Sequence, residues 1–313
     1  MRLVRLGVAG WERPAVMASD DAPDAFHLGD VVSHFDAEFF AADGLERVAA
    51  AVASGRLPRI SVENERIGPP IARPHAIYGI GLNYLDHARE IGAAAPAEPI
   101  VFNKAPNSLV GSEDDILLPP GSTHTDWEAE LGVVVRGRPR YLSSPDEAAA
   151  HIAGYVAVND VSERDMQLNR GGQWVKGKSF ETFNPSGPVL VTPDEMPNVS
   201  DLRLVLRVNG EIVQDGNTAD MIFGPSYLIW YLSQFLVLEP GDLINTGTPA
   251  GVGMSADPPR YRQPQDVVQL DISGPGTPRD VVRDPNAHRS VGSPTSDARS
   301  RRAAVSPSPT ALH

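Results

Sequence analysis

The sequence predicts an α+β fold that is rich in β-structure. Short runs of β-forming residues, bounded by proline or glycine, recur from residue 76 to residue 272. One run, Leu202–Val208, places an apolar residue at every second position and is followed by Asn209-Gly210, a pair typical of a tight β-hairpin. Helical patterns occupy short segments between these runs, which is typical of a mixed fold.

Composition limits the class of protein. A chain of 313 residues is long enough for one large domain or two modest ones. Its 41% hydrophobic and 21% charged residues are typical of a soluble globular protein. The net charge of −13 argues against nucleic acid and against an anionic membrane as partners. The chain has no cysteine, which excludes disulfides and thiolate chemistry and fits a cytoplasmic protein. We expect no signal peptide and no membrane span, because the apolar runs are too short.

Residues 1–72 are expected to form a small N-terminal domain. Arg2–Val8 and Ala25–Leu28 have the alternation of short strands. Leu45–Ser54 is an alanine-rich helix that a glycine ends. The segment Gly68–Pro74 contains prolines that exclude regular structure, which indicates a linker.

Residues 73–283 are expected to form the main domain, and residues 284–313 a disordered tail. The tail is predicted from a change to serine, proline, alanine and arginine, with almost no large apolar side chains. In the main domain we expect helices capped by Asn83 and by Ser144, and a third, apolar helix that starts at Pro225. The expected strands span residues 76–82, 99–105, 115–118, 126–135, 154–160, 202–208, 211–214 and 267–272.

Glu128 and Glu130 are the most informative residues of the chain. They are two residues apart in a run of β-forming residues, so in a strand their side chains share one face. Leu131, Val133 and Val135 would lie on the other face. Two adjacent like charges that face a sheet interior are unfavourable without a cation between them, and a hard divalent ion is the simplest candidate. The alternative is the solvated polar face of an edge strand.

His87 and Glu90 are three residues apart in a segment predicted to be helical, so both lie on one helix face. A carboxylate beside a histidine fixes its tautomer and raises its basicity, as a general base requires. The alternative is an ordinary surface ion pair, which the spacing alone favours.

Gly172–Ser179 matches the phosphate-binding pattern G-x-x-x-x-G-K-S/T, with Lys178 as its lysine. This motif functions only between a strand and a helix, where backbone amides hold the phosphates. No β-forming run precedes it, and Pro185 and Pro188 exclude a helix after it. We interpret the match as a coincidence and treat a nucleotide-hydrolysing enzyme as the least favoured function.

Taken together, these segments resemble the fumarylacetoacetate hydrolase superfamily. The resemblance covers about residues 76–255 and follows the order of that family's motifs. The motifs are Gly81-Leu-Asn-Tyr-Leu-Asp-His-Ala-Arg-Glu, Asp126-Trp-Glu-Ala-Glu-Leu, Asn159-Asp-Val-Ser-Glu-Arg-Asp, Gly177-Lys-Ser-Phe-Glu-Thr-Phe-Asn-Pro and Thr246-Gly-Thr-Pro-Ala-Gly-Val-Gly. The stretch from Gln167 to Ser179 is most similar to bacterial members that hydrolyse 2,4-diketo-3-deoxy sugar acids, such as the L-fuconate and L-rhamnonate derivatives.

The resemblance implies a mixed β-roll preceded by a small N-terminal domain, usually assembled as a homodimer. It also implies a Mg²⁺ or Mn²⁺ ion held by Glu128, Glu130 and Asp160, with water or substrate completing the coordination. The other implied roles are His87 and Glu90 for activating water, Lys178 for stabilising negative charge, and Arg164, Gln167 and Thr248 for contacting the substrate carboxylate and keto oxygens.

The resemblance implies hydrolysis of the C–C bond of an acylpyruvate, a 2,4-dioxo acid, to pyruvate and a carboxylic acid, and the residues are consistent with this chemistry. A small 2-oxo acid would chelate the metal, which would act as a Lewis acid while water activated by His87 attacks C4. A decarboxylase, hydratase or isomerase of a 2-oxo acid would use the same site and is the first alternative. A non-catalytic metal-binding protein is the second. The acyl group stays open, and we expect the residues between Glu90 and Ile100, together with the N-terminal domain, to determine it.

Overall fold

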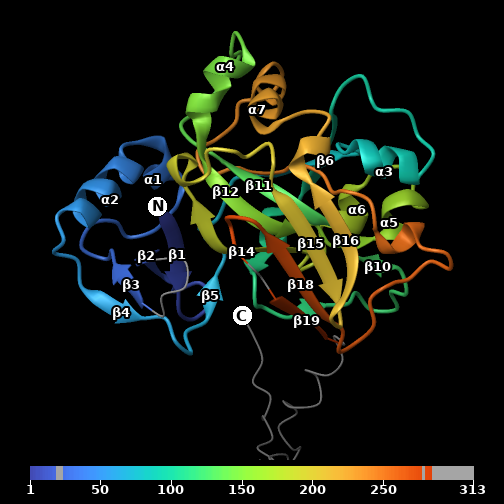
Figure 1. Ribbon diagram of the computed structural model, residues 1–313, viewed down its shortest axis with the longest axis horizontal. Helices are drawn as coiled ribbons and strands as arrows, with labels where there is room; N and C mark the ends of the chain where they lie inside the picture. The colour runs from blue at the N-terminus through green and yellow to red at the C-terminus, as the bar shows by residue number, and fades with distance from the viewer. Residues whose placement is uncertain (19–23, 277–278, 284–313) are drawn as a thin grey trace, which may run out of the picture.

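Strands dominate the computed structural model of the chain, which describes residues 1–18, 24–276 and 279–283 (Figure 1). The described strands form a large mixed sheet, a smaller sheet and a two-stranded ribbon, and the helices between them are short. This is the β-rich α+β fold expected from the sequence. The tail predicted for residues 284–313 lies outside the described residues.

The large sheet contains twelve strands of the described chain. Across the sheet the strands follow one another in the order β4 (Arg59–Ser61), β3 (Asp24–His27), β2 (Arg13–Met17), β1 (Arg2–Leu6), β14 (Asn184–Val191), β12 (Ile152–Asn159), β11 (Ala129–Val135), β17 (Leu243–Asn245), β6 (Ile77–Gly81) and β7 (Ile100–Lys104). Two further strands, β5 (Ile67–Gly68) and β8 (Leu109–Gly111), pair with β1 and β14. The pairs β14–β8 and β17–β6 are parallel and the other pairs of this sheet are antiparallel, so the sheet is mixed.

The smaller sheet packs against the large one and closes the core between them. Its strands follow in the order β16 (Glu211–Asn217), β15 (Arg203–Val208), β18 (Val267–Ile272), β19 (Arg279–Arg283) and β9 (Ile116–Leu117). Leu131 and Val133 of β11 share one buried cluster with Leu206 of β15. The predicted hairpin between β15 and β16 is confirmed, because Asn209 and Gly210 have φ values of +53° and +85°, as a type I′ turn requires. The ribbon pairs β10 (Thr125–Asp126) with β13 (Ser162–Glu163).

The α-helices of the described residues connect these strands. They are α1 (Ala37–Ala41), α2 (Gly44–Ala53), α3 (Leu85–Glu90), α4 (Pro145–Ala148), α5 (Arg164–Leu168), α6 (Val175–Lys178) and α7 (Pro225–Ser233). The predicted cap at Ser144 is confirmed, since its hydroxyl accepts the amide of Glu147 at 3.3 Å. The predicted start at Pro225 is also confirmed. None of the described helices is both long and apolar enough to cross a membrane.

The start of α3 differs from the prediction. Its N-cap is Tyr84, which makes no side-chain cap hydrogen bond, so the predicted cap at Asn83 is wrong. The fully buried Asn83 side chain instead donates to the carbonyls of Phe223 and Thr246, at 2.9 and 2.7 Å. The amide satisfies buried backbone groups of two distant segments, a requirement that the local sequence does not reveal.

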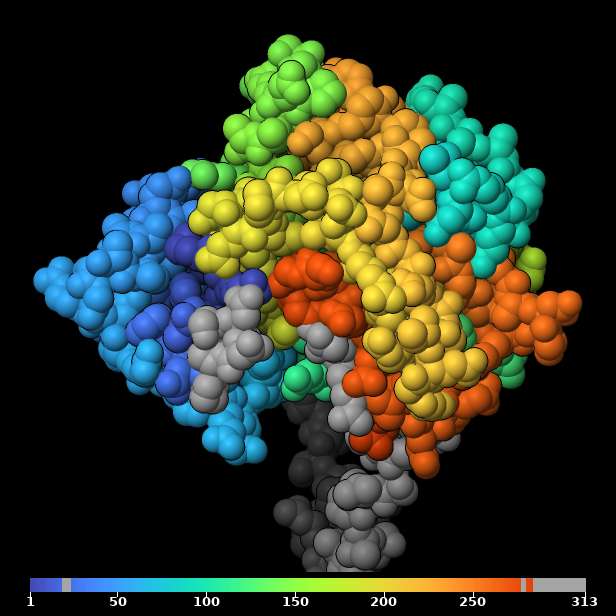
Figure 2. All heavy atoms as spheres, viewed as in Figure 1, coloured from blue at the N-terminus to red at the C-terminus, as the bar shows by residue number. Residues whose placement is uncertain are grey.

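The N-terminal residues continue the large sheet. β1 runs antiparallel to β14, with Arg2 opposite Val191 and Leu3 opposite Leu190. Leu3 and Leu190 also share a buried apolar cluster with Phe40. In Figure 2 the N-terminal residues (blue) accordingly lie directly beside the segment that follows β14 (yellow). The boundary at residue 72 stays a prediction, but the strands before it pair with the main sheet.

We predict that residues 73–283 do not fold cooperatively without residues 1–72. The deletion would remove strand β1, which pairs with β14, and would expose Leu190. Each large apolar side chain that loses its burial lowers the stability by roughly 1.5–3 kcal/mol. Urea unfolding followed by circular dichroism should show no cooperative transition for residues 73–283. A chain of residues 1–283 is the control and should keep the transition. Equal midpoints for the two chains would show that the N-terminal residues are dispensable.

Candidate metal centre and active site

Glu128 directly precedes β11 and Glu130 is its second residue, in the middle of the large sheet. β11 has β12 on one side and β17 on the other, so it is not an edge strand. Both side chains are buried, with 7% and 1% of the residue surface exposed. The alternative of a solvated polar face is therefore wrong. Leu131 and Val133 contribute to the core between the sheets, as the alternation predicts.

Asp160 follows β12, at the end where this strand passes the start of β11. The pairing of Ala129 with Asn159 sets its position, and the Asp160 amide donates to the Glu128 carbonyl at 2.9 Å. Carboxylate oxygens of Glu128, Glu130 and Asp160 lie within 4.8 Å of one another. The structure therefore brings together the three residues that the resemblance implies as metal ligands.

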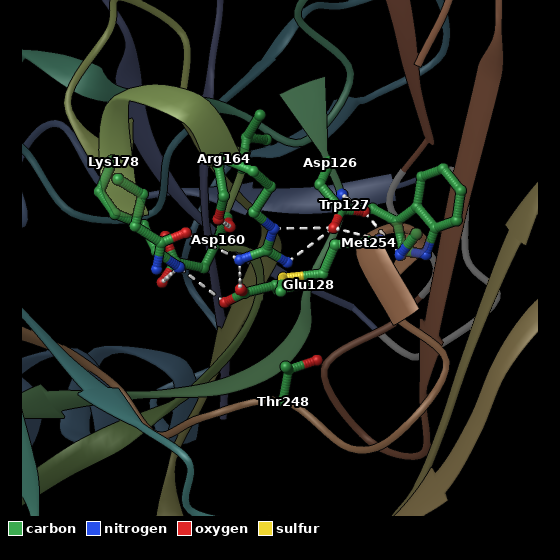
Figure 3. Close-up of polar contacts among 12 residues, drawn as sticks. Asp126, Trp127, Glu128, Asp160, Arg164, Lys178, Thr248 and Met254 are labelled. Atoms are coloured by element: carbon green, nitrogen blue, oxygen red, sulfur yellow. Dashed lines mark hydrogen bonds and ion pairs between the residues drawn. The ribbon is translucent and has the colours of Figure 1, made fainter. Parts of the chain in front are cut away.

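Basic side chains from three other segments surround these carboxylates. Lys178, at the end of α6, donates through Nζ to Glu128 Oε2 at 2.7 Å and to Asp160 Oδ2 at 2.9 Å (Figure 3). Arg164, at the start of α5, donates through Nη1 to Glu128 Oε1 at 2.6 Å. Lys104, at the end of β7, donates to Asp160. All three basic side chains are buried, and a buried charge is costly unless it is paired in this way.

The carboxylates differ in how their charge is compensated. Burial alone would raise the pKa of Glu128, but Lys178 and Arg164 outweigh burial and hold this pKa far below its usual range. Burial and the neighbouring charges of Asp160 and Glu128 raise the pKa of Glu130 well above its usual range. Glu130 accepts one backbone amide hydrogen bond, at 2.7 Å, and makes no hydrogen bond to a basic side chain within the described residues.

This donor set fits a hard divalent cation such as Mg²⁺ or Mn²⁺. Three carboxylates supply the oxygen ligands that both ions prefer. Among the described residues, no basic group donates a hydrogen bond to Glu130. A cation bound beside this side chain would provide the missing positive charge. Glu128, Glu130 and Asp160 are therefore the residues that would hold the ion.

His87 and Glu90 are in contact on one face of α3, as their spacing predicts. His87 Nδ1 and Glu90 Oε2 are 2.8 Å apart. Glu90 Oε1 also accepts the Gly251 amide at 2.8 Å, which fastens α3 to the loop after β17. Burial raises the pKa of Glu90, but the histidine and this amide outweigh burial and bring the pKa below its usual value. The two side chains are 13% and 21% exposed, so they are partly shielded from solvent, and the role of the pair as a base stays a prediction.

The residues predicted to bind substrate lie on two segments near the carboxylates. Arg164 Nη1 donates to Gln167 Oε1 at 3.0 Å, and both side chains are buried on α5. Thr248 lies on the loop after β17, below Glu128 in the view of Figure 3. Its hydroxyl accepts a hydrogen bond from Gln214 Nε2 at 2.9 Å. The contacts of these residues with a substrate stay predictions.

The pattern at Gly172–Ser179 does not form a phosphate-binding loop. In such a loop the helix follows the Gly-Lys pair, whereas here α6 spans Val175–Lys178 and ends at the lysine. Lys178 also donates to two carboxylates, whereas the lysine of a phosphate-binding loop contacts phosphates. The interpretation of the match as a coincidence is confirmed.

Two buried residues beside the cluster have no role predicted from the sequence. Lys104 donates to Asp160 and to a backbone carbonyl, the latter at 2.7 Å. Asp126 accepts hydrogen bonds from Arg164 Nε at 2.8 Å and from the Gly253 amide at 2.7 Å. The sequence contains one signal for them: Lys104 and Asp126 each lie at or next to an end of a predicted strand. Charged side chains are seldom buried without a partner, so a charged residue in such a place indicates a partner elsewhere in the fold.

The fold and the site together are those of an enzyme: a β-rich roll buries a carboxylate cluster, its balancing basic groups and a nearby histidine–glutamate pair. Residues 76–283 match the family described as fumarylacetoacetate (FAA) hydrolase C-terminal. The chain belongs to this family, and its mixed sheets with an N-terminal extension have the family's fold.

Similar proteins carry hydrolase and isomerase names. A Burkholderia multivorans protein with a provisional hydrolase name is 46% identical over 294 residues, which cover 90% of this chain and 99% of that protein. The solved structure of fumarylacetoacetate hydrolase from Exiguobacterium antarcticum is 32% identical, with a TM-score of 0.76 and coverage of 91% and 99%. That of 2-hydroxyhepta-2,4-diene-1,7-dioate isomerase from Mycobacterium marinum is 29% identical, with a TM-score of 0.72 and the same coverage. These relatives do not single out one member of the family, so the likeness to sugar-acid hydrolases stays a prediction.

We predict that Glu130→Gln abolishes divalent metal binding but stabilises the metal-free protein. The change removes a carboxyl group whose ionisation is opposed by burial and by the charges of Asp160 and Glu128, which raise its pKa. The pKa of Glu130 is higher in the folded protein than in the unfolded chain, where it is about 4.3. Above this pH the unfolded chain gives up the proton more readily than the folded protein does. The metal-free wild type therefore loses stability as pH rises above about 4.3. In EDTA, urea unfolding should therefore show the stability advantage of Glu130→Gln growing from about pH 5 to about pH 8.

Calorimetric titration with Mn²⁺ provides the second readout, and affinity should fall by about 100-fold or more. Glu128→Gln is the matched control. It should also lose the metal, but it should destabilise the protein, because Lys178 and Arg164 would lose a charged partner. Wild-type Mn²⁺ affinity in Glu130→Gln would show that the ion does not bind at these carboxylates.

Proposed function

We propose that this chain is a Mg²⁺- or Mn²⁺-dependent hydrolase that cleaves an acylpyruvate at the C–C bond between C3 and C4. The products are pyruvate and a carboxylic acid. The observation that carries the proposal is the buried group of Glu128, Glu130 and Asp160, with Lys178 bridging two of them. The hydrolase names of the Burkholderia multivorans and Exiguobacterium antarcticum relatives support it.

The substrate would bind beside the three carboxylates. A divalent ion held there would supply Lewis-acid charge and fix the carboxylate and 2-keto oxygens of a small 2-oxo acid. Gln167 and Thr248 offer an amide and a hydroxyl to the substrate oxygens. Arg164 keeps Glu128 ionised and holds it in place through the 2.6 Å hydrogen bond.

His87 is assigned as the general base. Glu90 binds Nδ1 and thereby favours the tautomer that carries its proton there, which leaves Nε2 to accept a proton from water. The water oxygen bonds to C4 of the substrate, and the C3–C4 bond then breaks. The electron pair of this bond moves to the pyruvate fragment, which takes the proton back from His87 at C3. Water is the only co-substrate that this sequence consumes.

Lys178 stabilises the negative charge that develops on the pyruvate fragment. Its ammonium group is already fixed by Glu128 and Asp160, so little reorganisation is needed when the charge appears. One such preorganised donor lowers a barrier by roughly 3 kcal/mol. Lys104 holds Asp160 from another side and keeps this carboxylate oriented.

Isomerisation of a 2-oxo acid is the second candidate. It is favoured by the Mycobacterium marinum structure, which is named an isomerase of a 2-hydroxy-diene-dioate. Isomerisation, hydration and decarboxylation of 2-oxo acids all need a group that stabilises negative charge, and hydrolysis differs in needing water at C4. The contact of His87 with Glu90 supplies a base that activates water in hydrolysis, and isomerisation needs such a base to move a proton, so an assay of the products decides between them. A homodimer and a cytoplasmic location also stay predictions.

A substrate panel decides between these functions. Acetylpyruvate, a longer acylpyruvate and oxaloacetate are incubated with the protein and Mg²⁺ or Mn²⁺, and pyruvate is measured by a coupled assay. We expect pyruvate from the acylpyruvates, and no pyruvate from them in EDTA. Pyruvate from oxaloacetate alone would contradict the hydrolase, and enol–keto conversion without pyruvate would favour the isomerase.

We predict that His87→Ala lowers kcat for acylpyruvate hydrolysis by about 100-fold or more, because the water loses its base. Its Mn²⁺ affinity, measured by calorimetry, should stay close to that of the wild type, since His87 is not among the three carboxylates that would hold the ion. His34→Ala is the matched control, because His34 is exposed among the N-terminal residues. A wild-type kcat in His87→Ala would show that this histidine is not the base that activates water.

A further inference from the structure

One face of β7 runs from the protein surface to the carboxylate cluster. Ile100, Phe102 and Lys104 alternate along this strand, so their side chains share a face. Their burial increases inward: Ile100 is 38% exposed, Phe102 is half-buried and Lys104 is 2% exposed. At the inner end Lys104 donates to Asp160. This face of β7 therefore extends from solvent to the carboxylate cluster, with the apolar side chains of Ile100 and Phe102 between them.

The neighbouring strand β6 leaves room for large rings on this face. Gly79 and Gly81 are paired with Phe102 and Ile100. A Cβ atom on Gly79 would lie 2.1 Å from Phe102 Cζ, and one on Gly81 would lie 2.5 Å from Trp174 Cζ3. Both aromatic rings thus lie directly on the β6 backbone, where any larger residue would displace them.

Trp174 connects this surface to the catalytic lysine. Its ring centroid is 5.3 Å from that of Phe102, and it directly precedes α6, the helix that ends at Lys178. The Lys178 ammonium lies 4.9 Å from the Phe102 ring centroid. Trp174 and Phe102 are both half-buried. We call the three residues Ile100, Phe102 and Trp174 the apolar strip.

We infer that the apolar strip is the acyl subsite and that it selects an acylpyruvate with a flat, apolar acyl group such as an aromatic ring. The inference rests on the proposed function. The strip begins next to Lys178, beside which the proposed function places the pyruvate part, and extends along β7 to the surface, so it offers the acyl group an apolar path out of the cluster. Half-buried rings at 5.3 Å and an interplanar angle of 55° offer edges and faces to a third ring.

A polyhydroxylated acyl group fits this surface poorly. Ile100 and Phe102 carry no hydrogen-bonding group, and Trp174 offers only its indole N–H. Sugar hydroxyls placed against the strip would lose water without gaining partners, and apolar sites discriminate against a hydroxyl by about 100-fold. The strip therefore favours aromatic over sugar-derived acyl groups, which departs from the likeness to sugar-acid hydrolases noted in the sequence.

The test compares kcat/KM for benzoylpyruvate and acetylpyruvate, with Mn²⁺ present. The wild type should prefer benzoylpyruvate, and Trp174→Ala should reduce the benzoylpyruvate-to-acetylpyruvate ratio by about tenfold or more. Trp11→Ala is the matched control, since Trp11 is 83% exposed, and should keep the wild-type ratio. Ile100→Ser changes an exposed position and should lower the ratio even if Trp174→Ala fails to fold. An unchanged ratio in the folded variants, or faster turnover of a 2,4-diketo-3-deoxy sugar acid, would overturn the inference.

A binding experiment separates this inference from the proposed function. Phenylpyruvate and pyruvate share the 2-oxo acid head and lack a C4 carbonyl, so calorimetry with the Mn²⁺-loaded protein needs no turnover. If no acylpyruvate is cleaved, the proposed hydrolase function is wrong. The strip is still supported if the wild type binds phenylpyruvate more tightly than pyruvate and Trp174→Ala removes this difference. If the wild type binds phenylpyruvate and pyruvate with equal affinity, the strip is not a subsite for aromatic groups.

Discussion

The burial of three carboxylates within 4.8 Å of one another is the constraint on which the rest of this structure depends. Each unpaired buried charge would cost several kcal/mol, which a marginally stable fold cannot tolerate. The chain compensates with Lys104, Lys178 and Arg164, which come from β7, α6 and α5. Each ion pair therefore also fixes the segment that supplies the basic group. Glu130 has only a backbone amide as a hydrogen-bond partner among the described residues, and this remaining charge makes the cluster suited to a cation.

The loop after β17 depends on the same carboxylates. Three acidic side chains each accept a backbone amide of this loop: Glu130 from Gly247, Glu90 from Gly251 and Asp126 from Gly253. At Gly253 a Cβ atom would lie 2.6 Å from Asp126 Oδ1 and 2.0 Å from a backbone carbonyl, so only glycine allows this approach. Because these acids belong to the candidate metal centre, to the His87–Glu90 pair and to the anchor of Arg164, a shift of the loop would disturb all three. The loop thus couples the helix α3 to the sheet.

Sequence reasoning reached the parts of the site whose geometry is local. Glu128 and Glu130 are two residues apart in a strand, and His87 and Glu90 three apart in a helix, so periodicity alone places each pair on one face. The role of Lys104 could not be predicted, because it depends on which strands are neighbours. The same limit explains the N-terminal strands: prolines suggested a separate unit, whereas β1 pairs with β14 from far along the chain. Strand pairing across long sequence distances leaves little trace in a single sequence.

The site combines a part that tolerates little change with a part that can vary. The carboxylates and their basic partners are buried, and removing one partner of a buried ion pair costs about 3–5 kcal/mol. The apolar strip lies at the outer end of β7 and before α6, on half-buried side chains that make no ion pair of the cluster. Exchanges at such positions usually cost far less stability than the loss of a buried ion pair, so they can change the shape offered to the acyl group without disturbing the charges. Relatives named as a hydrolase and as an isomerase have similar TM-scores to this chain, 0.76 and 0.72, so the shared fold does not distinguish the two activities. The motifs likewise identify the family but not the substrate, because most of their acidic and basic residues belong to the buried charges.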